Sequence, residues 1–169
     1  DALLVDLAPH GKGVVRLKGG DPYVLGRGGE EAAACRAADV AVEVVPGITS
    51  AIAVPAAAGI PVTHRGLSRG FSVITAHADL GVLPQRRDHT LILLMGVSRL
   101  RDSVASLLEA GSDPATPAAI IERGYHPDQR VTTTELRNVD TPPPLEMDFV
   151  SMAAEVSGAA STTLQPGSR

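Results

Sequence analysis

The sequence has little cysteine and few aromatic residues. It contains one cysteine, two tyrosines, two phenylalanines and no tryptophan among 169 residues. A single cysteine, Cys35, excludes a disulfide within the chain and any site built from several cysteines. Scarce aromatic residues argue against base-stacking platforms, and a net charge of −4 lacks the basic excess of nucleic-acid binders. We therefore expect no nucleic-acid partner, and a reducing, cytoplasmic setting.

Long hydrophobic runs are also missing. No stretch of about 18 apolar residues occurs, so we expect no membrane span. The sequence opens on Asp1 without a basic segment or an initiator Met, so we expect no signal peptide and an incomplete N-terminal end. The five histidines are scattered, which predicts no metal site. With 44% apolar and 20% charged residues, the composition is that of a globular protein with a real core.

The first third of the chain alternates predicted helices with short apolar runs. Leucines on one face predict a helix within 1–10, and alanines with early glutamates predict another over 29–38. Two β-branched runs, 14–17 and 42–45, are predicted as strands. An Ala-rich helix is expected over 49–58.

The remainder continues this alternation as far as residue 139. Apolar runs predict strands over 71–75, 91–95 and 118–121, and an amphipathic helix is expected over 98–110. The Thr-rich segment 131–136 is predicted as an edge strand.

The alternation defines the fold class as α/β. We expect an N-terminal lobe over 1–46, a connecting helix over 47–60 and a C-terminal lobe over 61–139. A proline cluster and a small, polar end predict an irregular or disordered tail over 140–169, with one weak helix near 148–156.

The most informative motif is the glycine-acid turn after the first predicted strand. Gly19 and Gly20 follow the strand directly, and Asp21 supplies a carboxylate. Ligands of open α/β sheets bind at the carboxyl ends of strands, and glycine lets the backbone approach them closely. The alternative is a tight Asp-Pro turn without a ligand. The string matches neither a dinucleotide nor a Walker A fingerprint.

A second turn of this kind follows the run 42–45. Thr49 and Ser50 stand where the Ala-rich helix begins, so free N–H groups and hydroxyls are available there. Such a helix start suits a carboxylate or the polar atoms of an adenosine. The alternative is simple capping of the helix by the two hydroxyls.

Four blocks together resemble the tetrapyrrole methylase family. They are RLKGGDPYVLGRGGEE (16–31), VVPGITSAIAVPAAAGIPVTHR (44–65), LILLMG (91–96) and IIERGYHPDQRV (120–131). The resemblance covers about residues 1–139, and the extended first block is similar to the uroporphyrinogen-III C-methyltransferase branch. It implies a two-lobed α/β fold with S-adenosylmethionine in the inter-lobe cleft and an incomplete N-terminal lobe.

The resemblance also implies which residues contact the cofactor. These positions are Gly19, Gly20, Asp21, Val24, Thr49, Ser50, Met95 and Gly124. A Gly20→Val substitution is accordingly expected to abolish cofactor binding. The implied reaction is methylation of uroporphyrinogen III at C2 and C7 to give precorrin-2 for sirohaem and cobalamin. Arg16, Arg27 and Arg65 are possible partners for the carboxylates of this tetrapyrrole, and the family suggests a homodimer.

The sequence departs from the family at both ends. The GxGPGD-like turn and the acid/base pair of the family are absent, so no catalytic residue is assigned. An apolar C-terminal strand of the family is replaced by PPPLEMDFVSMAAEV. The alternatives are a non-catalytic remnant that at most binds S-adenosylmethionine, and a related methylase of another corrin intermediate.

Overall fold

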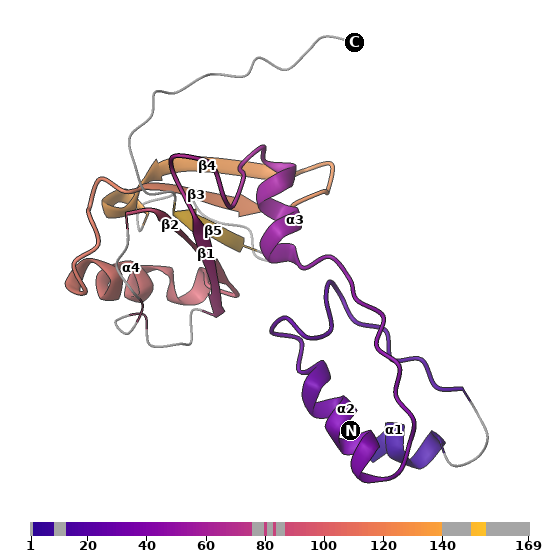
Figure 1. Ribbon diagram of the computed structural model, residues 1–169. Coiled ribbons are helices and arrows are strands. Elements are labelled where there is room, and N and C mark those ends of the chain that lie inside the picture. The colour runs from indigo at the N-terminus through magenta and orange to yellow at the C-terminus, as the bar shows by residue number, and fades with distance from the viewer. Residues whose placement is uncertain are drawn as a thin grey trace.

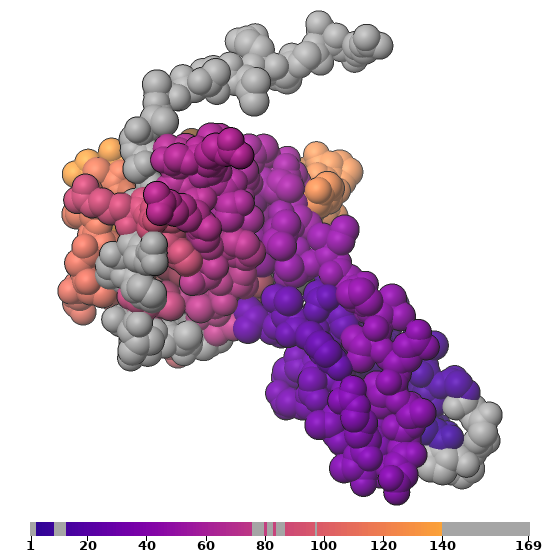
Figure 2. Space-filling view, viewed as in Figure 1, coloured from indigo at the N-terminus to yellow at the C-terminus, as the bar shows by residue number. Residues whose placement is uncertain are grey.

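A computed structural model describes residues 2–8, 13–75, 80, 83, 87–139 and 150–154. The N-terminal part contains helices α1 (Ala2–Leu7) and α2 (Gly28–Ala37). Both confirm the predicted helices, and α2 carries Glu30 and Glu31 in its first turn, where the helix dipole favours acids. In Figures 1 and 2 this part, coloured indigo to purple, lies to one side of the sheet-bearing remainder.

The two strands predicted in this part are wrong. Within the described residues 13–49, the segments 14–17 and 42–45 belong to no strand. A strand gains its stability from a ladder with a neighbour, and here Val15 and Leu17 remain 88% and 84% exposed. The Arg16 guanidinium also donates to the carbonyl oxygen of Leu17 at 2.7 Å.

The remainder is built on one five-stranded sheet with the order β1-β2-β5-β3-β4. The first two strands, β1 (Gly70–Thr75) and β2 (His89–Leu94), pair in parallel. Strands β3 (Pro117–Glu122) and β4 (Arg130–Glu135) pair antiparallel, and β4 forms the predicted edge. These four strands confirm the runs predicted from the sequence.

The fifth strand corrects the prediction for the C-terminal segment. Instead of a weak helix near 148–156 within an irregular tail, β5 (Val150–Ala154) lies in the centre of the sheet. It pairs antiparallel with β2 through Leu91↔Ala154 and with β3 through Ala118↔Ala154. Ladders on both sides outweigh the weak strand propensity of alanine, which is a tertiary effect invisible to local pattern.

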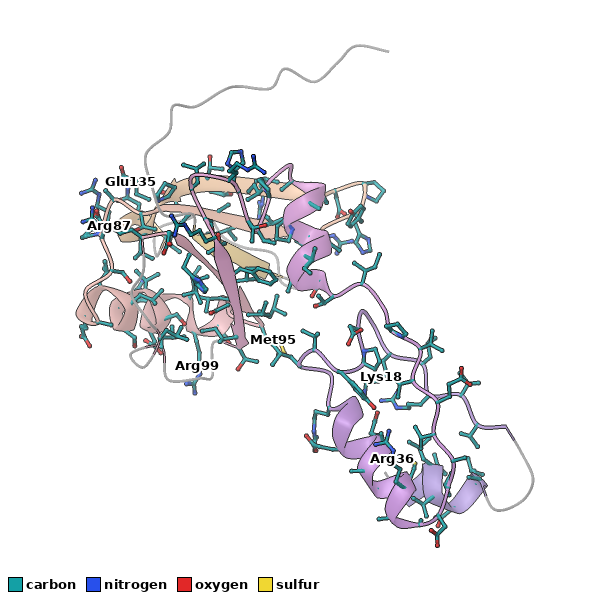
Figure 3. The ribbon with its side chains drawn as sticks, in the orientation of Figure 1. Lys18, Arg36, Arg87, Met95, Arg99 and Glu135 are labelled. Carbon is teal, nitrogen blue, oxygen red and sulfur yellow. The ribbon has the colours of Figure 1, made fainter. Side chains whose placement is uncertain are left out.

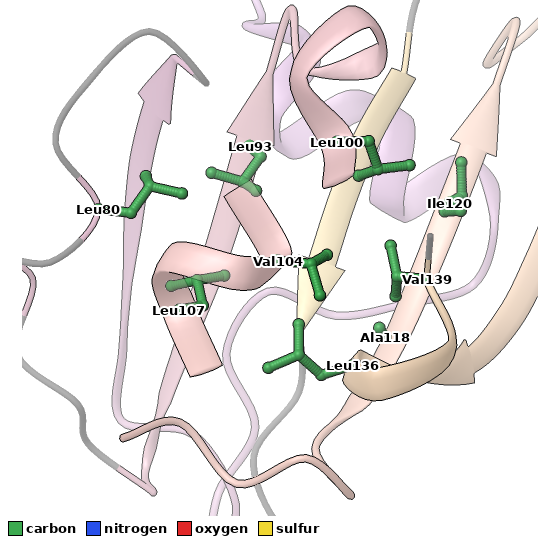
Figure 4. Packing of buried hydrophobic residues seen from close by; sticks show 9 residues of the cluster. All are labelled: Leu80, Leu93, Leu100, Val104, Leu107, Ala118, Ile120, Leu136 and Val139. Carbon is green, nitrogen blue, oxygen red and sulfur yellow. The ribbon is translucent and has the colours of Figure 1, made fainter. Parts of the chain in front are cut away.

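Helices cover both faces of this sheet. Helix α4 (Leu100–Glu109), which the 3₁₀ turn η3 (Val97–Arg99) precedes, packs on one face as predicted. Its core, shown in Figure 4, comprises Leu80, Leu93, Leu100, Val104, Leu107, Ala118, Ile120, Leu136 and Val139. Leu136 belongs to the 3₁₀ turn η4 (Leu136–Asn138), which follows β4.

Helix α3 (Ser50–Ala57) packs on the opposite face. Its Ala51 is fully buried against Ile92 and Leu94 of β2. Because side chains alternate along a strand, Leu93 faces α4 while its two neighbours face α3. The Ala-rich segment therefore forms the predicted helix and packs against β2 on the second face of the sheet. No described helix is long and apolar enough to cross a membrane.

Candidate functional site

The two sequence motifs that follow the extended segments lie against each other. Asp21 uses both carboxylate oxygens to join them: Oδ1 accepts from the N–H of Tyr23 at 2.8 Å, and Oδ2 accepts from the N–H of Gly47 at 3.1 Å. The first bond closes an Asx turn within the glycine-acid motif. The second crosses to the turn that begins α3. The Asp21 carboxylate thus has a structural task in addition to any ligand contact.

Glycine is required where the two turns touch. A Cβ at Gly47 would lie 2.2 Å from the carbonyl oxygen of Gly20, closer than any side chain permits. Gly20 has φ +72°, a left-handed conformation, and its own Cβ would face the backbone of Ile48 and Thr49 at 3.4 and 3.5 Å. Packing therefore explains Gly47, and the left-handed backbone conformation explains Gly20.

Gly19 differs from its neighbour. A Cβ there would meet nothing within 4 Å, and its φ lies outside the left-handed region. Neither packing nor conformation requires glycine at this position. An exposed backbone without a side chain, beside a rigid turn, is what a closely approaching ligand needs.

The other predicted residues of these motifs occupy defined places. Val24 donates its N–H to the carbonyl oxygen of Asp21 at 3.3 Å, and its side chain is 36% exposed. The Thr49 hydroxyl caps α3 by accepting from the N–H of Ala51 at 3.3 Å, as the capping alternative requires. Ser50 is the first residue of the helix and is half-buried.

Met95 and Gly124 follow the carboxyl ends of two strands of the sheet. Met95 comes directly after β2, has φ 56° and is 51% exposed. Gly124 follows β3 and lies between two left-handed residues, Arg123 at φ 51° and Tyr125 at φ 67°. Left-handed non-glycine residues are strained and gather at functional sites. In Figure 3, Met95 lies on the side of the sheet nearest the N-terminal part, where Lys18 is found.

Helix α3 connects these groups of residues. Its first residue, Ser50, lies near Gly20, and its buried Ala51 packs on Leu94, the residue before Met95. Further along the helix, the Val54 side chain lies 2.7 Å from where a Cβ of Gly124 would stand. The structure thus brings three of the motif blocks against α3, which belongs to the fourth block.

Ion pairs fasten the extended segment 13–18 to α2. Lys18 Nζ lies 2.8 Å from Glu31 Oε2, and Arg16 Nε lies 3.2 Å from Glu31 Oε1. The hydrogen bond from Lys18, aided by the positive charges of both cations, lowers the pKa of Glu31 below its ordinary value. These ion pairs hold the extended segment 13–18 against α2, although the segment forms no sheet ladder.

The three arginines considered for substrate carboxylates differ in their partners. Arg16 contacts Glu31, and Arg27 pairs with Glu30 at 2.7 Å, which raises the pKa of the guanidinium and lowers that of the carboxyl. Arg65 lies in an exposed turn beside a hollow of about 520 Å³. The hollow is lined by Thr63, His64, Arg65, Gly66, Leu67, Ser68, Arg69 and Asp88.

This hollow lies apart from the predicted cofactor residues. Arg69 precedes β1 and Asp88 precedes β2, so the hollow is at the amino ends of the parallel strands. Met95 follows the carboxyl end of β2, and six strand residues span roughly 17 Å. The hollow and the predicted cofactor residues are therefore at opposite ends of the strands.

Sequence reasoning missed two residues that shape the site. Val54 sets the closest approach of Gly124 to α3, and Gln129 joins the turn after β3 to the end of that helix. Both lie inside blocks that carry the family resemblance, 44–65 and 120–131, but their residue types alone assign them no role. Only the tertiary contact across 72 residues identifies Gln129.

Met95 and Gly124 follow the carboxyl ends of two strands of an α/β fold, which is where ligands of such folds commonly bind. The sequence profile of the tetrapyrrole (corrin/porphyrin) methylases matches residues 1–140. The chain belongs to this family.

Curated relatives and a solved structure agree with that assignment. The chain is 50% identical over 149 residues to the S-adenosyl-L-methionine-dependent uroporphyrinogen III methyltransferase of Methanosarcina barkeri, covering 81% of this chain and 57% of that protein. It is 42% identical over 162 residues to a uroporphyrinogen-III C-methyltransferase of Methanobacterium ivanovii, covering 90% and 70%. The chain thus spans little more than half of the first relative.

The solved structure is uroporphyrin-III C-methyl transferase from Thermus thermophilus, complexed with S-adenyl homocysteine. It superposes with a TM-score of 0.75 at 38% identity, covering 90% of this chain and 68% of that chain. The predicted α/β fold of the tetrapyrrole methylases is therefore confirmed.

Proposed function

We propose that this chain carries the S-adenosylmethionine site of a uroporphyrinogen-III methyltransferase. The observation that carries the proposal is the convergence of three motif blocks on α3, which belongs to the fourth, with open backbone at Gly19 and an exposed Met95 beyond β2. Its relatives are named for the same methyl transfer. The proposed reaction methylates C2 and C7 of uroporphyrinogen III to give precorrin-2.

The residues present fit the cofactor. S-adenosylmethionine supplies an electrophilic methyl group and needs no metal for that chemistry. Gly19 and Gly20 offer backbone to the ligand, Thr49 and Ser50 offer hydroxyls at the start of α3, and Met95 offers an apolar contact. The hydrogen bond from the Gly47 N–H to Asp21 holds the glycine-acid turn against the turn before α3. Val24 and Gly124 complete the predicted set of cofactor residues. No described residue is assigned as acid or base.

The test is calorimetric titration of the 169-residue chain with S-adenosyl homocysteine, followed by an assay with S-adenosylmethionine and uroporphyrinogen III. We expect saturable binding and, if turnover occurs, a product heavier by two methyl groups. A folded chain that does not bind the cofactor analogue would contradict the proposal.

One observation favours the alternative of binding without turnover. Val15, Leu17 and Val45 are 88%, 84% and 74% exposed on segments that form no ladder. The described residues leave these apolar side chains uncovered on segments without a ladder. Cofactor binding together with an unchanged porphyrinogen would support this alternative.

We further infer two lobes divided at the connecting segment 47–60, a homodimer and a cytoplasmic setting. The packing of α3 on the sheet associates this helix with the C-terminal lobe, and the single cysteine, which is buried, fits a reducing compartment. Light scattering on the purified chain tests the dimer, since a monomeric mass at micromolar concentration contradicts it.

A further inference from the structure

One side chain fastens the turn after β3 to helix α3. Gln129 Oε1 accepts a hydrogen bond from the N–H of Tyr125 at 2.9 Å, and Gln129 Nε2 donates to the carbonyl oxygen of Ala57 at 3.2 Å. The same amide group therefore joins two segments that are 72 residues apart in the sequence.

The carbonyl that Gln129 reaches is one that the helix leaves open. The last carbonyls of a helix have no partner within it and need one elsewhere. Carbonyls of Val54, Pro55 and Ala56 accept from the N–H groups of residues 58–60. The next carbonyl, that of Ala57, accepts from Gln129. The side chain thus completes the end of α3.

The other end of the link holds a strained turn. Tyr125 has φ 67° and Arg123 has φ 51°, so Gly124 lies between two left-handed residues. Gly124 also packs directly on Val54, which is one helical turn before Ala57 and on the same face of α3. Contact at Val54 and the hydrogen bond at Ala57 together fix how closely the Gly124 backbone approaches the helix.

We propose that Gln129 is a positioning residue that sets the Gly124 side of the cofactor site. The proposal rests on the proposed function, in which Gly124 contacts S-adenosylmethionine. The amide is suited to the task because it donates and accepts at once. A carboxylate of the same shape keeps the acceptor for Tyr125 but cannot donate to Ala57, and a thioether of similar length has no effective donor.

The test compares Gln129→Glu, Gln129→Met and the unchanged chain by titration with S-adenosyl homocysteine, below the thermal midpoint of each protein. We expect affinity about three- to tenfold weaker for Gln129→Glu, the range for one lost hydrogen bond. Gln129→Met is expected to lose at least as much. Asp113→Ala is the control, because it removes a 2.9 Å side-chain bond to the Ala115 N–H in the turn before β3.

Stability and affinity together separate the outcomes. A structural role alone lowers the thermal midpoint of the Gln129 variants and of Asp113→Ala alike while the dissociation constant stays unchanged. Unchanged affinity in a folded Gln129→Glu or Gln129→Met protein overturns the positioning role. If the unchanged chain does not bind S-adenosyl homocysteine, the proposed function itself is overturned. This outcome differs from failure of the positioning role because it is seen without any substitution.

Discussion

The carboxylate of Asp21 accepts a hydrogen bond from the backbone N–H of Gly47, 26 residues further along the chain, at 3.1 Å. This contact joins the glycine-acid turn to the turn that starts α3. The sequence predicts the two motifs separately, and this hydrogen bond brings them together.

The first prediction concerns Asp21 itself. Asp21→Ala removes the acceptor for both Tyr23 and Gly47, so we expect a loss of about 1–3 kcal/mol in unfolding free energy and weaker cofactor binding. Asp21→Asn keeps one carbonyl acceptor and is expected to lose less. Chemical denaturation and titration on both variants provide the check, and equal behaviour of alanine and wild type would refute the link.

Gly19 and Gly47 provide a matched pair of alanine substitutions. Gly47→Ala places a Cβ 2.2 Å from the Gly20 carbonyl oxygen and is expected to disrupt the N-terminal part. Gly19→Ala meets open space and is expected to fold normally, with weaker binding of S-adenosyl homocysteine. Circular dichroism and calorimetry separate the two effects. Full affinity in Gly19→Ala would show that no ligand approaches there.

Gly20→Val is expected to abolish cofactor binding, and the structure gives the reason more fully. Its φ of +72° is costly for a β-branched residue, and the added carbon faces the backbone before α3. We therefore expect a lower thermal midpoint as well as lost binding. Binding that survives in this variant would mean that the turn can change its conformation freely.

Gly124 and Val54 form a pair suited to a double-mutant cycle. Gly124→Ala brings a Cβ within 2.7 Å of a Val54 methyl group, and overpacking of this kind costs about 1–3 kcal/mol. Val54→Ala removes both methyl groups and leaves its Cβ at 3.1 Å. The double variant is therefore expected to be more stable than the sum of the single changes indicates. Additive effects on denaturation would exclude the contact.

The ion pairs of Glu31 are expected to make the thermal stability of the chain depend on pH. Its ordinary pKa is 4.5, and the hydrogen bond from Lys18 lowers that value in the folded chain. Because the folded pKa is depressed, the stabilisation is complete above pH 4.5 and is lost as the pH falls through the folded value. Glu31→Gln is expected to lower the thermal midpoint at pH 7 but not in strong acid, whereas the exposed control Glu43→Gln should show little difference at either pH. An equal effect of Glu31→Gln at both pH values would contradict the ion pair.

Most of the regular elements could be predicted because their patterns are local. The amphipathic pattern of α4 and the apolar runs of β1, β2 and β3 each indicate which side chains are buried. The failures at 14–17, 42–45 and 150–154 share one cause. Strand formation depends on a neighbour that a short sequence window does not contain, so two β-branched runs lack a ladder and an alanine-containing segment gains two.

The sequence by itself determined the family and the residues to examine, since the blocks around Gly19 and Thr49 are specific strings in a fixed order. Tertiary structure alone decided which glycines packing requires, how Asp21 joins two turns, and that Gln129 completes the end of α3. The physical reason is that these are distances between segments remote in the chain. Local propensity fixes a helix or a turn, but only packing fixes what lies against it.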